Sequence, residues 1–263
     1  MKTHLGSQLR AKLRSSAMLC GPWVSIPAPA VVELMAMGDN DFLLIDGEHS
    51  SVSAKSLGTL LPCAENHDKP VIYRVPSCSS PEIKFALDAG VSGVMVPMIE
   101  TAQQAETVVA NCRYAPQGQR GIGPWRASGY YRNFADYLAQ ANQSITLVLQ
   151  IESRLGVANL DAIAAVEGFD VLYVGPSDLA ASHGLPNAEL GEEMRAILQR
   201  ICTAGLAQGK TMGIDVHSVA QIPTLQHMGF SFFTIGSDME FISNGADGLS
   251  RQLSQLSAGG QGT

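Results

Sequence analysis

Continuous runs of hydrophobic residues recur along the chain, with helix-like segments between them. The clearest runs cover residues 42–46, 71–75, 94–97, 145–151, 171–175 and 232–236, and weaker runs cover 18–25 and 211–215. Hydrophobic runs that do not alternate with polar residues are typical of strands covered on both faces, as in a parallel sheet. Eight strands separated by helices predict an α/β protein with the (β/α)8 TIM-barrel fold.

Helical spacing and helix-end signals occur between these runs. Ser80 followed by Pro81 predicts the start of a helix, and Gly90 predicts its end. Thr101 and Gln104 fit a capping box. One face of another predicted helix carries residues at helical spacing, namely Met194, Ile197, Leu198, Ile201, Cys202 and Gly205.

An open, doubly wound sheet would show the same alternation of strands and helices. No glycine-rich dinucleotide-binding motif follows the first predicted strand, which favours the barrel. We expect one domain over residues 1–263. It should contain a long irregular segment at 115–133 and a loose, glycine-rich tail from about residue 257.

Composition and charge narrow the class of protein. The 263 residues are 46% hydrophobic and 16% charged, which supports one large core and argues against disorder. The formal net charge is −7 and no cluster of Lys and Arg is present, which argues against nucleic-acid binding.

Cysteine spacing and hydrophobicity bear on the cellular compartment. The cysteines are odd in number and widely spaced, which predicts small buried residues rather than a disulfide framework or a zinc site. They are Cys20, Cys63, Cys78, Cys112 and Cys202. Residues 1–14 lack the apolar core of a signal peptide, and the apolar stretch at 91–99 is too short to cross a bilayer. We therefore expect a cytoplasmic protein that does not act on membranes.

Polar residues gather where the predicted strands end. They are Asp46, Glu48 and His49 after the second strand, Arg74 in the third, Gln150 and Glu152 in the fifth, and Ser177 and Asp178, which follow Gly175 at the end of the sixth. Each alone has a commoner explanation, such as a helix cap, a surface ion pair or a structural histidine. In a barrel, however, the ends of all strands share one mouth, where active sites form. Their joint placement therefore favours a catalytic site.

Glu152 and Asp178 are the candidate metal ligands. Carboxylates on adjacent strands can hold one divalent ion through oxygen and leave positions for water and substrate. Such hard ligands suit Mg²⁺, Mn²⁺ or Co²⁺ better than a structural Zn²⁺. The alternative, two carboxylates without a metal, would be unfavourable because like charges repel.

Three further groups fit an anionic substrate. His49 suits proton transfer because the reference pKa of histidine is near neutral. Arg74 suits a developing enolate or carboxylate oxygen, since its charge is permanent and its donors form a fork. The amides of Ser177 and Asp178 lie at a predicted helix N-terminus, which favours an anion.

Several stretches resemble the HpcH/HpaI family of class II pyruvate aldolases over residues 23–242. The matching stretches are FLLIDGEH at 42–49, IK at 83–84 with LD at 87–88, VPM at 96–98, RYAP at 113–116 with RG at 120–121, QIE at 150–152 and GPSDL at 175–179. The resemblance implies a (β/α)8 barrel that assembles into a homohexamer. It also implies reversible cleavage of a 4-hydroxy-2-oxo acid to pyruvate and an aldehyde through an enolate held on a divalent metal.

The resemblance also implies roles for individual residues. Glu152 and Asp178 would bind the metal, and His49 would be the catalytic base. Asp88 would orient that histidine, and Arg74 would steady the enolate. Asp46 would lie on the acceptor side, and Trp23, Gln150 and Gly175 would contact substrate.

Two stretches depart from the family pattern. After Gly121 the family commonly continues with a Leu-Ala-Arg-Ala-Ser segment, whereas residues 123–128 read GPWRAS. After Ile214, at the end of the seventh strand, this chain has Asp215 where an aliphatic residue is common. We expect Asp215 to meet the aldehyde, or alternatively to pair with Arg126 or His217.

Two other functions are compatible with these residues. One is a lyase of the citrate-lyase-β or malyl-CoA type, which would need a basic patch for coenzyme A phosphates that the sequence does not show. The other is a barrel that binds a keto acid without turnover, which the joint presence of His49, Arg74, Glu152 and Asp178 argues against.

Overall fold

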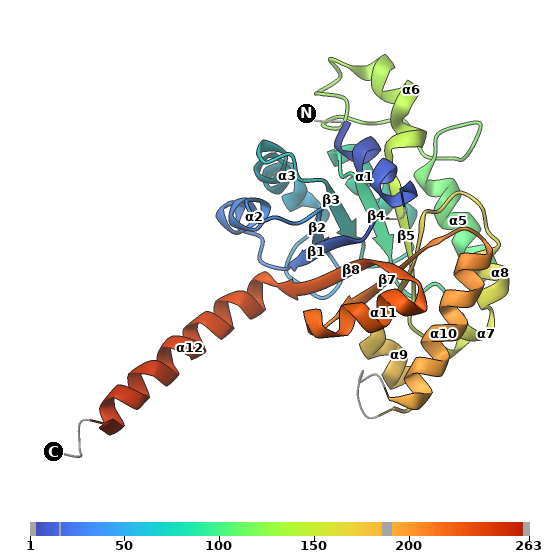
Figure 1. The fold of residues 1–263 in the computed structure, drawn as a ribbon. Helices are drawn as coiled ribbons and strands as arrows, with labels where there is room; N and C mark the ends of the chain where they lie inside the picture. The colour runs from blue at the N-terminus through green and yellow to red at the C-terminus, as the bar shows by residue number, and fades with distance from the viewer. Residues whose placement is uncertain (1–3, 16, 186–190, 260–263) are drawn as a thin grey trace.

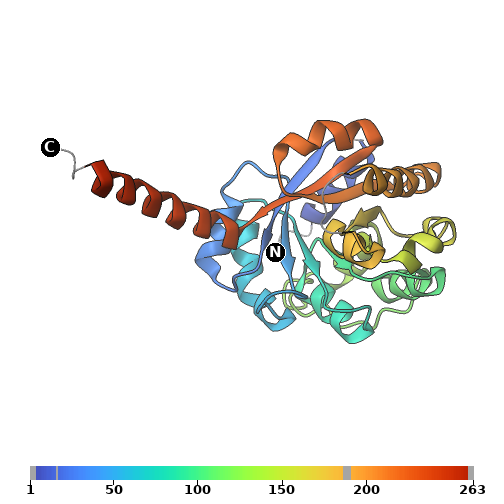
Figure 2. The ribbon, with the colours of Figure 1, turned by 90° about the horizontal axis from the view of Figure 1, so that it is seen from below.

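The predicted barrel is present. The computed structural model describes residues 4–15, 17–185 and 191–259. Every strand pairs in parallel with its neighbours, and β8 closes the barrel against β1 (Figures 1 and 2). The strands are β1 Leu19–Val24, β2 Leu43–Asp46, β3 Val71–Arg74, β4 Gly93–Val96, β5 Thr146–Ile151, β6 Val171–Val174, β7 Thr211–Val216 and β8 Phe230–Ser237.

Helices surround this barrel. They are α1 His4–Arg14, α2 Pro29–Ala36, α3 Leu57–Asn66, α4 Ser80–Ala89, α5 Ala102–Cys112, α6 Phe134–Ser144, α7 Arg154–Ala158, α8 Leu160–Ala164, α9 Pro176–His183, α10 Glu192–Ala207, α11 Ile222–Met228 and α12 Asp238–Gly259. Short 3-10 turns cover Ala54–Ser56 and Val219–Gln221. The predicted strand bounds differ from the observed ones by a residue or two, the usual uncertainty of strand ends.

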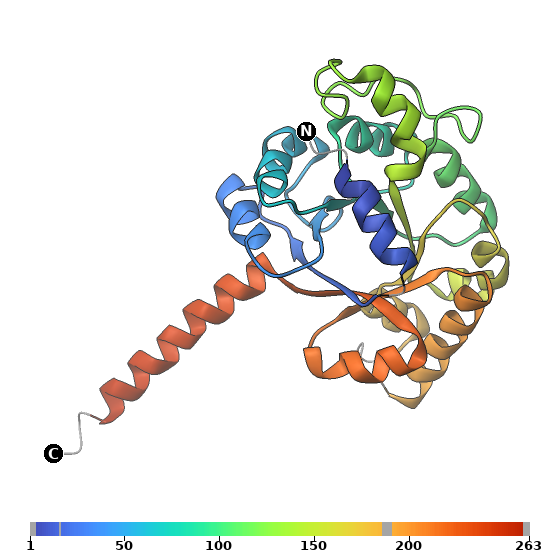
Figure 3. The same cartoon turned by 45° about the horizontal axis from the view of Figure 1, so that its top comes forward.

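Helix α1 closes the amino-terminal end of the barrel (Figure 3). Its Leu9 and Leu13 pack into the cluster inside the barrel, together with Leu44 and Phe232. No helix was predicted for this segment. The apolar residues of α1 recur every four residues and occupy one helix face, while charged residues cover the other faces.

The predicted helix ends are close to the observed ones. The capping box of α5 is present, with the Gln104 amide 3.2 Å from the Thr101 hydroxyl. Helix α4 ends at Gly90, whose φ of 101° is left-handed. Its N-cap is Ser79 rather than Ser80, because Pro81 occupies the second helical position.

Residues 115–133 form no helix or strand in the described chain, as predicted. Two buried arginines nevertheless hold the segment to the barrel. Arg120 lies 2.6 Å from Asp88, and Arg126 lies 2.9 Å from Glu65. The unusual residues at 123–128 are therefore part of an ordered structure.

Helix α12 projects away from the barrel (Figure 1). Its first residue, Asp238, is buried and accepts hydrogen bonds from the amides of Ser25 and Ile26 at the end of β1. From residue 239 to 256 every side-chain position except Gly248 is exposed. The predicted loose tail lies partly outside the described residues, and the helix continues to Gly259.

All five cysteines are free, as predicted. Cys112 and Cys202 are buried, but Cys78 is exposed, because it lies in the loop between β3 and α4. Among the described helices none is long and apolar enough to span a membrane.

Candidate active site

A cavity of about 300 Å³ opens at the carboxyl ends of the strands. It gathers most of the predicted site residues: Trp23, Asp46, His49, Arg74, Gln150, Gly175, Ser177, Asp178 and Asp215. A larger hollow, lined by Arg14 and Lys210 among others, lies by the starts of β7 and β8. Active sites of (β/α)8 barrels lie at the carboxyl ends of the strands, so the smaller cavity is the candidate active site.

Asp46 organises the turn after β2. Its Oδ1 accepts hydrogen bonds from the amides of Glu48 at 2.9 Å and His49 at 3.3 Å. Arg74 donates from Nε to Oδ1 and from Nη2 to Oδ2, each at 2.8 Å. Burial alone would raise the pKa of Asp46, but these contacts lower it below the usual value.

Arg74 is held from several sides. Besides its paired bonds to Asp46, its Nη1 lies 3.2 Å from a Glu48 oxygen, and its guanidinium carbon lies 4.4 Å from the centre of the Trp23 ring. Pairing with a carboxylate, the commoner role for a strand-end arginine, is thus present here. A guanidinium has five N–H donors, so donors remain for a substrate oxygen.

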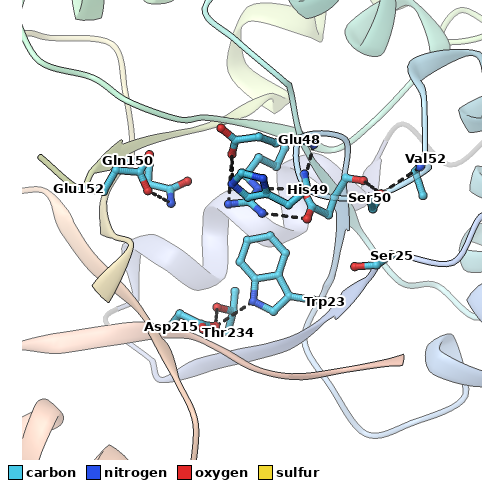
Figure 4. A network of polar contacts seen from close by, with 12 residues as sticks. Trp23, Ser25, Glu48, His49, Ser50, Val52, Gln150, Glu152, Asp215 and Thr234 are labelled. Atoms are coloured by element: carbon cyan, nitrogen blue, oxygen red, sulfur yellow. Dashed lines mark hydrogen bonds and ion pairs between the residues drawn. The ribbon is translucent and has the colours of Figure 1, made fainter. Parts of the chain in front are cut away.

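Glu152 is buried beside Gln150 and Gly175. One carboxylate oxygen accepts from the Met98 amide at 2.8 Å, and the other accepts from the Gln150 side-chain nitrogen (Figure 4). A Cβ added to Gly175 would lie 2.3 Å from the second oxygen, so only glycine leaves this space. Burial raises the pKa of Glu152 to about 7, and the charges of Glu48 and Asp178 add to the shift.

These residues fit a divalent cation. Glu48 and Asp178 lie near enough to Glu152 to raise its pKa, and the Oε1 atom of Gln150 is buried without a partner. A cation would offset the repulsion among the carboxylates, and their oxygens are the ligands that Mg²⁺ and Mn²⁺ prefer. No group of three or more His, Cys, Asp or Glu side chains arranged around one point is found in the described chain. Water or substrate would have to complete the coordination.

Asp178 and Ser177 lie in the first turn of α9 and are exposed. Pro176 sets the start of this helix, directly after the buried Gly175. Amides of the first turn have no intrahelical acceptors, so those of Ser177 and Asp178, which line the cavity, are available as donors for an anion.

His49 stands at the rim of the cavity. Its side chain is 64% exposed, and its Nε2 lies 3.8 Å from a Glu48 oxygen. Asp88, the residue implied to orient it, is buried at the end of α4 and contacts Arg120 instead. The resemblance gave Asp88 its role, and the described residues of a single chain do not bring it to His49.

Asp215 is held by hydrogen bonds. Its Oδ1 accepts from the Trp23 indole nitrogen at 2.8 Å and from the Thr234 hydroxyl. Burial raises its pKa above the usual value, although these two bonds oppose the shift. Pairing of Asp215 with Arg126 was wrong, because Arg126 bonds Glu65 on the outside of the barrel.

Several residues in or beside the cavity were not predicted. Tyr173, on β6, lines the cavity. It shares a hydrogen bond of 2.5 Å with Thr234 of β8, and both side chains are wholly buried. Polar side chains at inward positions of these strands were the available signal. Glu240, on α12, also lines the cavity, and no strand-end pattern could have found it.

The fold and the site define a class: a (β/α)8 barrel with an acidic, metal-compatible mouth that also holds an arginine and amide donors. The chain belongs to the HpcH/HpaI aldolase/citrate lyase family, whose sequence model matches residues 19–245.

Individual relatives agree with this membership. The chain is 34% identical to 5-keto-4-deoxy-D-glucarate aldolase of Salmonella paratyphi C (strain RKS4594) over 233 residues, 89% of this chain and 91% of the relative. A structure of an HpcH/HpaI aldolase/citrate lyase family protein from Burkholderia cenocepacia J2315 has a TM-score of 0.88 at 30% identity, covering 94% of this chain and 99% of that one. The structure of citrate synthase SbnG has a TM-score of 0.84 at 29% identity, covering 96% and 98%.

Proposed function

We propose that this protein is a metal-dependent class II aldolase that reversibly cleaves a 4-hydroxy-2-oxo acid to pyruvate and an aldehyde. The observation that carries the proposal is the cavity that Asp178, Arg74 and His49 share, with the buried Glu152 close enough for the charges of Asp178 and Arg74 to act on it. The 34% identity to a relative named as an aldolase supports the same reaction class.

Glu152 and Asp178 would hold Mg²⁺, Mn²⁺ or Co²⁺ in a cytoplasmic enzyme. When bound, the metal would polarise the substrate carbonyl and acidify the adjacent carbon. Arg74 would donate to the oxygen on which enolate charge develops, and the first-turn amides of α9 would hold the substrate carboxylate. His49, at the open rim, would move the proton.

Asp215 would influence the choice of aldehyde, because it lines the cavity. A carboxylate there disfavours an aldehyde that carries its own carboxylate, since like charges repel more strongly in a partly dry pocket than in water. It favours an aldehyde with a hydroxyl or amino group. A panel of neutral, hydroxylated and carboxylated aldehydes tests this preference.

We also propose a homo-oligomer in which α12 packs on a second copy of the chain. Met239, Ile242 and Leu249 lie on one face of α12 and are each about half exposed, at 49%, 57% and 58%. The outward-facing Cys20 of β1 and Ile235 of β8 are only half-buried, whereas the outward residues of other strands are fully covered. If two copies of the chain each packed the apolar face of α12 over β1 and β8 of the other copy, the face of α12 and the outer face of these strands would both be covered. The same contact would then form twice, as in a symmetric dimer.

The decisive experiment measures aldol cleavage by Glu152→Ala and Asp178→Ala with added Mn²⁺ or Mg²⁺. Both variants should fold, by circular dichroism, and lose activity. Wild-type protein should lose activity in excess chelator and regain it when metal returns. Near-normal activity in both variants would exclude the metal site. Cleavage of a coenzyme A thioester, and not of any 4-hydroxy-2-oxo acid, would instead indicate the lyase alternative.

A further inference from the structure

A line of hydrogen bonds runs along the cavity wall from β6 to β1, and Figure 4 shows its part from Thr234 through Asp215 to Trp23. Tyr173 and Thr234 share a bond of 2.5 Å, the Thr234 hydroxyl donates to Asp215, and the Trp23 indole nitrogen donates to the same oxygen at 2.8 Å. Because Thr234 gives its single proton to Asp215, Tyr173 must donate to Thr234. The direction of every bond in the line is therefore determined.

The far end of this line reaches Arg74. The Trp23 ring covers one face of the guanidinium, 4.4 Å from ring centre to Cζ. Asp46 holds one edge of the same group through two bonds of 2.8 Å. Glu48 contacts the remaining nitrogen at 3.2 Å, so the indole and the two carboxylates together restrict the orientation of the guanidinium. Asp46 is anchored by its own turn, whereas the N–H of the Trp23 ring is anchored on Asp215.

The supports of Asp215 are rigid. Thr234 and Tyr173 are wholly buried, so water does not compete for their bonds. Asp215 and Thr234 are register partners in adjacent strands, β7 and β8. The carboxylate is thus set by the barrel itself rather than by a loop.

We propose that Asp215 is a positioning residue that holds the Trp23 indole against Arg74 and thereby orients the guanidinium toward the keto acid. This inference rests on the proposed function for the reaction that is measured. It places an effect of Asp215 on the pyruvate half of the reaction, before any aldehyde binds.

Exchange of pyruvate methyl protons with deuterated water, with Mn²⁺ present, isolates this half-reaction. Asp215→Leu should slow exchange roughly two- to tenfold, the effect of losing one or two hydrogen bonds. Asp215→Asn should recover most of the rate, because its amide oxygen still accepts from the indole. Thr234→Val should act like Asp215→Leu but less strongly, and it serves if Asp215→Leu does not fold.

A double-mutant cycle tests the link through Trp23. Trp23→Phe keeps an aromatic face for Arg74 but removes the N–H donor. Once that donor is gone, adding Asp215→Leu should cost little more, so the two effects should not add. Additive effects, or unchanged exchange in Asp215→Leu, would refute the positioning role. If Asp215→Asn and Asp215→Leu slowed proton exchange equally, the negative charge of Asp215 rather than its hydrogen bond to Trp23 would matter. That result would also refute the positioning role.

Tryptophan emission gives a readout that needs no activity. The chain has two tryptophans, so Trp125→Phe leaves Trp23 as the reporter. In that background Asp215→Leu should shift the emission and increase quenching by acrylamide, and Asp215→Asn should shift it less. Unchanged emission would overturn the inference. Absence of pyruvate exchange in wild-type protein would overturn the proposed function, while the emission would still report on Trp23.

Discussion

His49 follows β2 at the rim of the cavity, and its Nε2 lies 3.8 Å from a Glu48 oxygen. We expect His49→Ala to lower pyruvate proton exchange by roughly two to four orders of magnitude, the usual effect of removing a positioned base. His67 offers a matched control, because its Nε2 also lies 3.8 Å from a glutamate oxygen, that of Glu33, but on the outside of the barrel. Exchange that survives in His49→Ala would mean that another group moves the proton.

The raised pKa of Glu152, about 7, gives a second prediction at the residue scale. Metal coordination needs the carboxylate form, so affinity for Mn²⁺ should fall by up to about tenfold per pH unit below pH 7. The folding stability of the metal-free protein should change with pH in the opposite direction. Glu152 has a pKa of about 7 in the folded protein, whereas an ordinary glutamate in the unfolded chain has a pKa of about 4.3. The free energy of unfolding should therefore decrease as the pH rises from about 4.3 to about 7.

Calorimetric titration with Mn²⁺ at several pH values, in buffers of different ionisation enthalpy, measures the affinity and the protons released. Glu152→Gln should bind weakly and show little pH dependence. Glu106→Gln, an exposed carboxyl on α5, should behave as wild type. Constant affinity below pH 7 would contradict the raised pKa.

The sequence predicts which residues lie at the site where their position at a strand end is enough to place them there. His49, Arg74 and Glu152 follow from the rule that strand ends share one mouth. Bond partners could not be predicted, because they depend on side-chain direction. Asp46, for example, was expected on the acceptor side, and its bonds to Arg74 and to its own turn were not foreseen. That acceptor-side role stays a prediction.

At the scale of elements, hydrophobic runs predicted all eight strands, because a strand buried on both faces needs a continuous run. Helix α1 was not predicted, because its three leucines are separated by polar and charged residues and cover only one face of the helix. The junction between β6 and α9 was also predicted, but its tightness depends on a contact between Gly175 and Glu152 that no pattern encodes.

This junction gives a prediction of its own. Gly175→Ala should weaken Mn²⁺ binding by an order of magnitude or more, because the new methyl group would displace the Glu152 carboxylate, 2.3 Å from the added Cβ. Gly191→Ala is a matched control: it is also the N-cap glycine of a helix with negative φ, but nothing lies within 4 Å of its added Cβ. Titration of both variants with Mn²⁺ decides. An affinity for Mn²⁺ as high as that of the wild type in Gly175→Ala would show that the metal site does not need the space that Gly175 leaves for Glu152.

At the scale of the molecule, strand number and order could be predicted, since eight alternating units close on themselves in only a few ways. The direction of α12 could not be predicted. Asp238, the first residue of α12, bonds the Ser25 amide after β1, a residue far away in the sequence, and from there the helix runs away from the barrel (Figure 2). A helix with an apolar face that the described residues of its own chain do not cover points to a second molecule.

The last prediction therefore concerns assembly. Leu249 lies at the middle of the apolar face of α12 and is 58% exposed. Leu249→Asp should shift the protein from an oligomer to a smaller species, because a buried charge without a partner strongly disfavours a packed interface. Ser250→Asp adds the same charge to the neighbouring exposed position and should leave the assembly unchanged. Sedimentation velocity over a range of protein concentrations measures both. A wild-type protein that sediments as a single chain at all concentrations, or a Leu249→Asp variant that assembles as wild type does, would show that α12 does not join two copies.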